Sequence, residues 1–136
     1  MRNTTILLID NRKTIIETIK KSFLEVKIKH VLFTAANENE AWLMLDGSHK
    51  LNPIPKIILI DVNSTNNEGI DFLKAIRNHP DLKSSLVFVI TDSKQEINKE
   101  AALQLNIAGY IHMVFESGKL NPSFSILNDY WNIIEF

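Results

Sequence analysis

The chain lacks cysteine, a strong net charge and a long apolar run. The absence of cysteine among its 136 residues excludes a disulfide framework, a thiolate metal site and a cysteine nucleophile. The formal net charge is −1 with lysines and arginines spread along the chain, so charge does not favour nucleic acid or an anionic membrane as partner. The apolar run near the N-terminus is too short for a secretory signal or a membrane span. We therefore expect a soluble, cytoplasmic protein.

Apolar residues make up 45% of the chain, which is enough for one core in a domain of ordinary size. No repeat or linker divides the sequence, so residues 1–136 are expected to form a single domain. A small nucleotide- or flavin-binding protein would need a phosphate loop rich in glycine or hydroxyl groups after its first strand. Residues 11–14 read Asn-Arg-Lys-Thr, which disfavours that class of protein.

Short apolar runs without polar alternation predict strands that are buried on both faces. Such runs occupy residues 5–10, 30–35, 56–61, 86–91 and 108–112. Helical periodicity or helix-start and helix-stop signals place helices at residues 13–26, between Asn37 and Gly47, and at residues 70–78, 95–105 and 122–134. This alternation predicts an α/β fold with a doubly wound, five-stranded parallel sheet, for which 2-1-3-4-5 is the common strand order.

The first, third and fourth predicted strands end on Asp10, Asp61 and Thr91. Ligands of such sheets bind at the carboxyl ends of the strands, where the strand order reverses between the first and third strands. We therefore expect Asp10 and Asp61 to share a pocket, although each aspartate alone could be only a turn former or helix cap, and Thr91 only a strand-end cap. Two adjacent carboxylates favour a cation such as Mg²⁺, and an aspartate so placed can act as a nucleophile toward phosphorus.

The aromatic residues near the C-terminus allow more than one interpretation. Tyr110 fits core or edge packing as well as a switch. A helical stripe predicts a core face, although its two bulkiest members could reach a partner; it comprises Phe124, Leu127, Tyr130, Trp131 and Ile134. An apolar face on the fourth helix would permit a homodimer but could equally be core; it comprises Ala101, Ala102 and Leu105.

Four segments, in their order and spacing, resemble bacterial response-regulator receiver domains. They are ILLIDN at 6–11, ILIDVN at 58–63 followed by Glu68-Gly69, VFVIT at 87–91 and AGYI at 108–111. The resemblance spans residues 5 to 134. Two further segments, HPDLK at 79–83 and DYW at 129–131, resemble stand-alone receivers found with bacterial phytochromes.

The resemblance implies a flavodoxin-like receiver fold and a phosphoacceptor domain rather than an enzyme. A histidine kinase or phosphotransfer protein would phosphorylate Asp61, and Thr91 would hydrogen-bond the phosphoryl group. Tyr110 would change rotamer as the signal passes to a downstream protein target. Mg²⁺ would be held by Asp10, Asn11, Asp61 and the backbone carbonyl of Asn63.

Two departures from the family pattern leave a second hypothesis open. The family usually has two adjacent acids where this chain has Asp10-Asn11, and a Lys-Pro pair where it has Met113-Val114. The loss of one acid and one lysine leaves the net charge of the site at −2, but Mg²⁺ loses a charged ligand. The phosphoryl group loses an ammonium partner, for which Lys94 is the one speculative replacement.

Two functions therefore remain in competition. Asp61 and Thr91 favour a phosphoacceptor with weakened Mg²⁺ binding. Asn11 and Met113 favour a pseudo-receiver, an interaction module that signals by binding alone.

Overall fold

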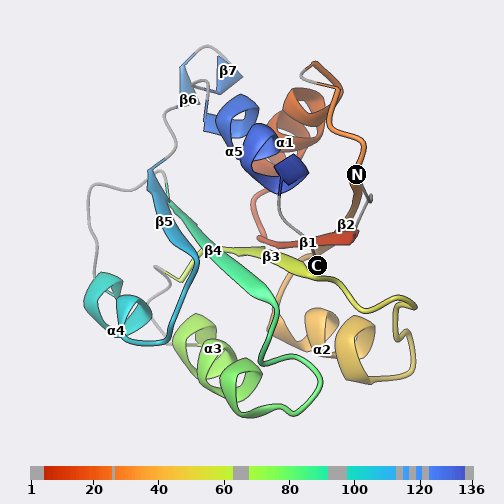
Figure 1. Ribbon diagram of the computed structural model, residues 1–136, viewed down its shortest axis with the longest axis vertical. Helices are drawn as coiled ribbons and strands as arrows, with labels where there is room; N and C mark the ends of the chain where they lie inside the picture. The colour runs from red at the N-terminus through yellow and green to blue at the C-terminus, as the bar shows by residue number, and fades with distance from the viewer. Residues whose placement is uncertain are drawn as a thin grey trace.

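A parallel sheet forms the middle layer of the molecule (Figure 1). The computed structural model describes residues 5–25, 27–62, 68–91, 98–112, 115–116, 119–120 and 123–133. The five strands of the sheet are β1 (Thr5–Ile9), β2 (Val31–Ala35), β3 (Ile57–Ile60), β4 (Leu86–Thr91) and β5 (Gly109–His112). Their order is β2-β1-β3-β4-β5 and every neighbouring pair is parallel. The predicted fold class and strand order are confirmed.

Helices cover both faces of this sheet (Figure 1). They are α1 (Lys13–Glu25), α2 (Glu38–Asp46), α3 (Glu68–Asn78), α4 (Lys99–Leu103) and α5 (Ser123–Ile133). The α4 helix begins after Asn98, later than the predicted start at residue 95. A short antiparallel pair, β6 (Phe115–Glu116) and β7 (Lys119–Leu120), lies between β5 and α5 and was not predicted. No helix in the part of the chain that the structure describes is long and apolar enough to cross a membrane.

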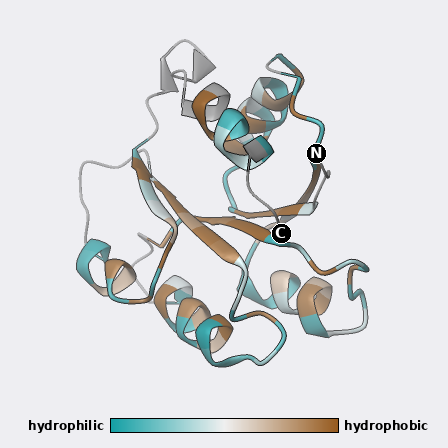
Figure 2. Ribbon diagram, viewed as in Figure 1, coloured by the Kyte–Doolittle hydropathy of each residue, from teal (hydrophilic) through white to brown (hydrophobic). Residues whose placement is uncertain are grey.

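Strand side chains alternate between two hydrophobic clusters, one on each face of the sheet. Leu7, Ile58 and Val89 belong to the cluster that includes residues of α2 and α3. Neighbouring strand residues such as Ile6 and Leu59 belong to the cluster that includes residues of α1 and α5. Because both faces are covered, the central strands β1, β3 and β4 are mostly apolar along their length and are drawn largely in brown in Figure 2.

Only part of the predicted aromatic stripe on the last helix belongs to the core. Leu127 and Trp131 are buried, and the Trp131 ring lies 5.9 Å from that of Phe88 in an edge-on arrangement. Tyr130 is 41% exposed, so it lies only partly on the core face and agrees better with the alternative that it could reach a partner. The side chains of Phe124 and Ile134 lie outside the described residues.

The apolar face predicted on the fourth helix is mostly core rather than free surface. Ala102 is fully buried, and Leu105 packs against the same cluster, whereas Ala101 is exposed.

The start of α2 matches its prediction closely, because the Asn37 side chain accepts a hydrogen bond from the Glu40 backbone N–H at 2.9 Å.

Candidate functional site

The sheet register brings Asp10 and Asp61 to the same level on neighbouring strands. Ile9 of β1 lies opposite Ile60 of β3, and each aspartate is the next residue along its strand. The Asp10 side chain is only 1% exposed, whereas that of Asp61 is 23% exposed. The predicted meeting of the two acids at the carboxyl ends of β1 and β3 is therefore present in the structure, with one carboxylate buried and the other open to solvent.

A single arginine joins the two carboxylates. Nη2 of Arg12 lies 2.7 Å from Oδ2 of Asp10 and 3.1 Å from Oδ2 of Asp61. Nε and the backbone N–H of Arg12 also donate to Oδ1 of Asp10, at 3.0 and 2.8 Å. The guanidinium remains charged at any ordinary pH, so these three side chains together carry a charge of −1. Charge-assisted, bidentate contacts between arginine and a carboxylate are among the stronger hydrogen bonds in proteins.

The local sequence explains why Arg12 points back at Asp10. The Asp10 carboxylate accepts the backbone N–H two residues on, which is an Asx turn, and α1 begins directly afterwards at Lys13. The Arg12 carbonyl accepts from the N–H of Ile16, so Arg12 stands at the first turn of the helix. Asp10 is thus both a turn former and a member of the shared pocket.

Sequence reasoning missed Arg12, because it considered residues 11–14 only as a possible phosphate loop. The signal that could have found it is the spacing of two residues between a strand-end aspartate and an arginine. Such spacing lets an Asx turn fold the long side chain back onto the carboxylate.

Thr91 and Tyr110 lie on the strands next to this pair. Thr91 is 1% exposed and ends β4, one residue beyond the level of Asp61 on the adjacent strand. Tyr110 lies opposite Val89 and packs against the cluster of α2 and α3. Its hydroxyl is buried and has no hydrogen-bond partner among the described residues, and Nζ of Lys99 lies 5.4 Å from its ring centroid. Tyr110 therefore packs into the core, as one of its two interpretations expected.

Of four further positions that were named from the sequence, the structure describes one. Asn11 is exposed between β1 and α1. Asn63, Lys94 and Met113 lie outside the described residues.

The donors at this site suit a hard divalent cation, but the position between the carboxylates is taken. Carboxylate and amide oxygens, as in Asp10, Asp61 and Asn11, are ligands that Mg²⁺ accepts. One nitrogen of Arg12, however, contacts both carboxylates at once. Over the described ranges, no three His, Cys, Asp or Glu side chains are grouped so as to hold a metal ion.

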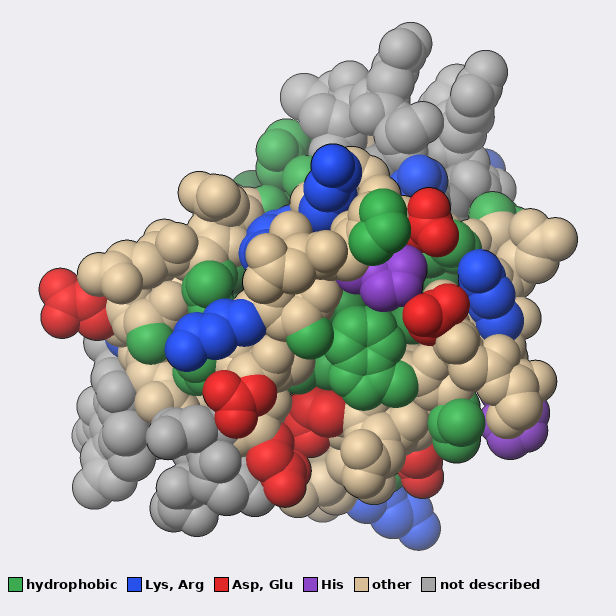
Figure 3. Space-filling model, turned by 90° about the horizontal axis from the view of Figure 1, so that it is seen from below, with side chains coloured by type: hydrophobic (Ala, Val, Ile, Leu, Met, Phe, Trp, Pro, Cys, Tyr) green, Lys and Arg blue, Asp and Glu red, His purple; other side chains and the backbone are tan. Residues whose placement is uncertain are grey.

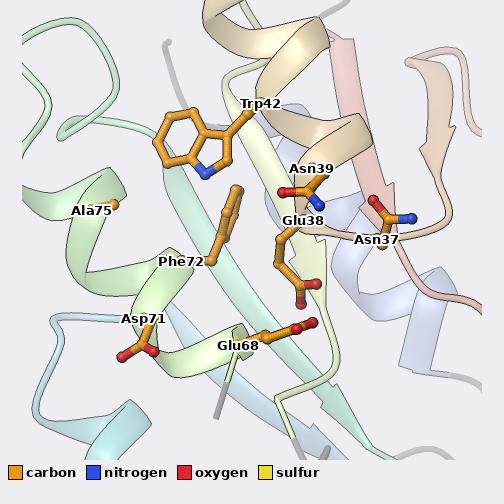
Figure 4. Close-up of a pocket in the computed structure, with 8 residues that line it drawn as sticks. All are labelled: Asn37, Glu38, Asn39, Trp42, Glu68, Asp71, Phe72 and Ala75. Carbon is orange, nitrogen blue, oxygen red and sulfur yellow. The ribbon is translucent and has the colours of Figure 1, made fainter. Parts of the chain in front are cut away.

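A separate cavity of about 270 Å³ lies between α2 and α3 (Figure 4). The Trp42 and Phe72 rings, 5.1 Å apart, lie at it, and Glu38, Glu68 and Asp71 contribute carboxylates. Acidic and hydrophobic side chains lie side by side on this face of the molecule (Figure 3). None of the predicted site residues lines the cavity, so it is distinct from the Asp10–Asp61 pair.

Comparisons with known proteins agree with this architecture. Response regulator Rcp1 of Synechocystis sp. is 29% identical over 108 residues, which are 78% of this chain and 74% of Rcp1. A crystal structure of the Mn²⁺-bound form of Rcp1 superposes with a TM-score of 0.80 at 24% identity, covering 98% of this chain and 97% of that one. A two-component response regulator from Legionella pneumophila gives 0.75 at 28% identity, covering 95% and 97%.

A further similar structure is that of the phosphorylated cyanobacterial phytochrome response regulator RcpA. Its TM-score is 0.78 at 22% identity, and the match covers 99% of this chain and 98% of RcpA. The family model of the response regulator receiver domain matches residues 6–123, which include the five strands of the sheet except Thr5, the first residue of β1. With the strand order, the paired acids and this match in agreement, the chain belongs to the response regulator receiver domain family and is a receiver of two-component signalling.

Proposed function

We propose that the chain accepts a phosphoryl group on Asp61 from a histidine kinase or a phosphotransfer protein. The observation that carries this proposal is the contrast between the two acids. The Asp61 side chain is 23% exposed, so a phosphoryl donor can reach it. The Asp10 side chain is 1% exposed and holds the Arg12 guanidinium next to Asp61. We place this reaction in the cytoplasm, as membership of the family suggests.

In the proposed reaction, a carboxylate oxygen of Asp61 attacks phosphorus and forms an acyl phosphate. The bond between phosphorus and the donor imidazole breaks, and the imidazole leaves with the electron pair and takes up a proton from water. The added negative charge develops beside Arg12, whose Nη2 is 3.1 Å from Asp61. Thr91, buried at the end of the adjacent strand, is the proposed hydroxyl donor to the phosphoryl oxygens.

Asp10, Asp61, the side chain of Asn11 and the backbone carbonyl of Asn63 are the proposed ligands of a Mg²⁺ ion. When bound, the ion would neutralise charge on the phosphoryl oxygens. Asn11 offers a neutral amide where the family pattern has a second acid, so we expect weak binding. The crystallised Mn²⁺-bound form of Rcp1 supports a divalent cation in this role.

The proposed output is contact with a downstream protein through the surface of α4, β5 and α5. Leu103 of α4 is 50% exposed, and Ile126 and Tyr130 of α5 are 67% and 41% exposed. Tyr110 on β5 packs between this surface and the core and is the proposed switch. A second copy of the chain is the alternative occupant of this surface.

One observation favours the pseudo-receiver as a second candidate. Arg12 already supplies a cation to Asp61. A chain in which this pair never opens would signal by binding alone, without a phosphoryl group.

Incubation with acetyl phosphate and Mg²⁺, followed by intact mass measurement, tests the phosphoacceptor. We expect a mass gain of one phosphoryl group that Asp61→Asn abolishes. Asp71→Asn, at an exposed aspartate of α3, is the matched control and should retain the gain. The absence of an adduct at every Mg²⁺ concentration would favour the pseudo-receiver, and an adduct that persists in Asp61→Asn would refute the assignment of the acceptor.

A further inference from the structure

We infer that Arg12 is a built-in cation of this receiver site, and that a divalent metal binds only when the Arg12 guanidinium leaves the carboxylate pair. The inference deepens the proposed function, since it concerns how the same site is regulated. It rests on the distances around Arg12.

The guanidinium takes the place that a shared metal ion would need. Nη2 is within 3.1 Å of one oxygen from each carboxylate, so it occupies the space between the two side chains that would hold the ion. A guanidinium and a divalent cation in contact would repel each other strongly at this distance, most of all beside the buried Asp10. The two cations therefore compete.

The charge balance predicts that a divalent cation binds the carboxylates more tightly when Arg12 is absent. With Arg12 in place the pair presents a net charge of −1, and without it the pair presents −2. The guanidinium cannot release its proton, so it can give way only by moving.

Movement is structurally feasible, because the Arg12 side chain is 33% exposed and only its side-chain contacts need to break. The backbone N–H of Arg12 donates to Asp10 at 2.8 Å, and this hydrogen bond does not involve the guanidinium. The buried carboxylate thus keeps one hydrogen bond while the guanidinium is exchanged for another cation.

The same residue supplies Asp61 with a positive partner in place of the family lysine. The family lysine is replaced by Met113, and the structure has Arg12 in contact with Asp61 instead. A planar guanidinium is well suited to pair with phosphate oxygens. Arg12 thus holds the acids together before phosphorylation and faces the phosphoryl group after it.

Direct binding of Mn²⁺ tests the competition without any phosphorylation step. Free Mn²⁺ is followed by electron paramagnetic resonance while wild type, Arg12→Gln and Lys13→Gln are titrated. Glutamine keeps a donor near Asp10 but has no charge, so we expect Mn²⁺ to bind Arg12→Gln about tenfold more tightly, a typical size for coupling between two binding events. Lys13→Gln removes one positive charge from the exposed neighbouring residue and should bind as the wild type does.

Arg12→Lys keeps the positive charge but not the planar guanidinium. Its affinity for Mn²⁺ should fall between those of wild type and Arg12→Gln. It also provides a folded comparison if the glutamine variant unfolds, which thermal denaturation monitors. Equal affinities in wild type, Arg12→Lys and Arg12→Gln would overturn the inference. So would an equal gain in Lys13→Gln, or a failure of both Arg12 variants to bind Mn²⁺.

The experiments distinguish a failure of the proposed phosphoacceptor role of Asp61 from a failure of the proposed competition between Arg12 and a divalent metal. Tighter Mn²⁺ binding by Arg12→Gln without any adduct on Asp61 would support the inference and refute the phosphoacceptor. An adduct on Asp61 with unchanged Mn²⁺ affinity would do the reverse.

Discussion

Two arginines at opposite ends of the sheet use the same side chain in different ways. Arg12, at the carboxyl ends of the strands, pairs with the charged groups of Asp10 and Asp61. Arg77 of α3, at the other end, donates within the described residues to neutral backbone carbonyls, those of Lys83, Ser85, Leu105 and Asn106, at 2.8 to 3.0 Å. Burial lowers the pKa of Arg77 from its ordinary value. An arginine guanidinium nevertheless stays protonated in proteins.

The difference lies in what could replace each arginine. The carbonyls around Arg77 belong to two separate parts of the chain, residues 83–85 and 105–106, and the planar guanidinium with its five N–H donors is needed to reach them together. The carboxylates around Arg12 need positive charge, which a metal ion supplies as well. One end of the molecule therefore uses arginine as a fixed structural clamp, and the other uses it as an exchangeable counter-ion.

The largest effect on stability is expected from removing the clamp. Arg77→Ala loses four hydrogen bonds from a charged donor and leaves partly buried carbonyls without their partner, which should lower the free energy of unfolding by about 3 kcal/mol. Urea denaturation measures this. Arg77→Lys keeps the charge but cannot reach all the carbonyls, so it should recover less than half of the loss, and full recovery would show that charge alone matters there.

A smaller loss of stability is expected from removing Arg12 at the carboxyl ends of the strands, and Mg²⁺ should reverse this loss. In metal-free buffer Arg12→Ala should lower the free energy of unfolding by about 1.5 kcal/mol, because the buried Asp10 loses its side-chain partner while Arg12 itself is partly solvated. Millimolar Mg²⁺ should restore much of the loss in Arg12→Ala and none of it in Arg77→Ala. If Mg²⁺ stabilised both variants equally, the contrast between clamp and counter-ion would be wrong.

The same contrast separates what the sequence could predict from what it could not. The meeting of Asp10 and Asp61 follows from two apolar runs that end on an acid, because parallel neighbouring strands bring those ends together. The direction of the Arg12 side chain depends on a turn of two residues, which strand and helix periodicity does not reveal. The partners of Arg77 include carbonyls 28 and 29 residues away, and no local pattern encodes them.

A related limit applies to exposure. The helical spacing of the last helix predicted Tyr130 on the core face together with Trp131, but adjacent residues on a helix point about 100° apart. Trp131 fills the space against Phe23 and Phe88, and Tyr130 is left at its edge, 6.5 Å from the Phe88 ring. Spacing identifies the side of a helix, while the size of the neighbouring side chains decides which residue enters the core.

The smallest expected effect is a pH dependence of the free energy of unfolding. It arises from His30, at the end of the sheet where Arg77 lies, which is the structural end. His30 immediately precedes β2 and is 5% exposed beside Trp131. Burial lowers its pKa from 6.5, against the opposing effect of a hydrogen bond with Asn132. Below pH 6.5 the unfolded chain therefore binds a proton that the folded chain resists.

The contribution of His30 to stability is accordingly complete above pH 6.5 and is lost as the pH falls toward the folded-state pKa. Urea denaturation at a series of pH values should show the free energy of unfolding decreasing through this window in wild type, and a flatter profile in His30→Gln. His49→Gln, at an exposed histidine, should keep the wild-type slope. Mn²⁺ affinity compared at one fixed pH should be the same in His30→Gln and wild type, because His30 lies at the opposite end of the sheet from Arg12. A changed affinity would mean that the two ends are coupled, and the division into a structural end and an exchangeable end would have to be abandoned.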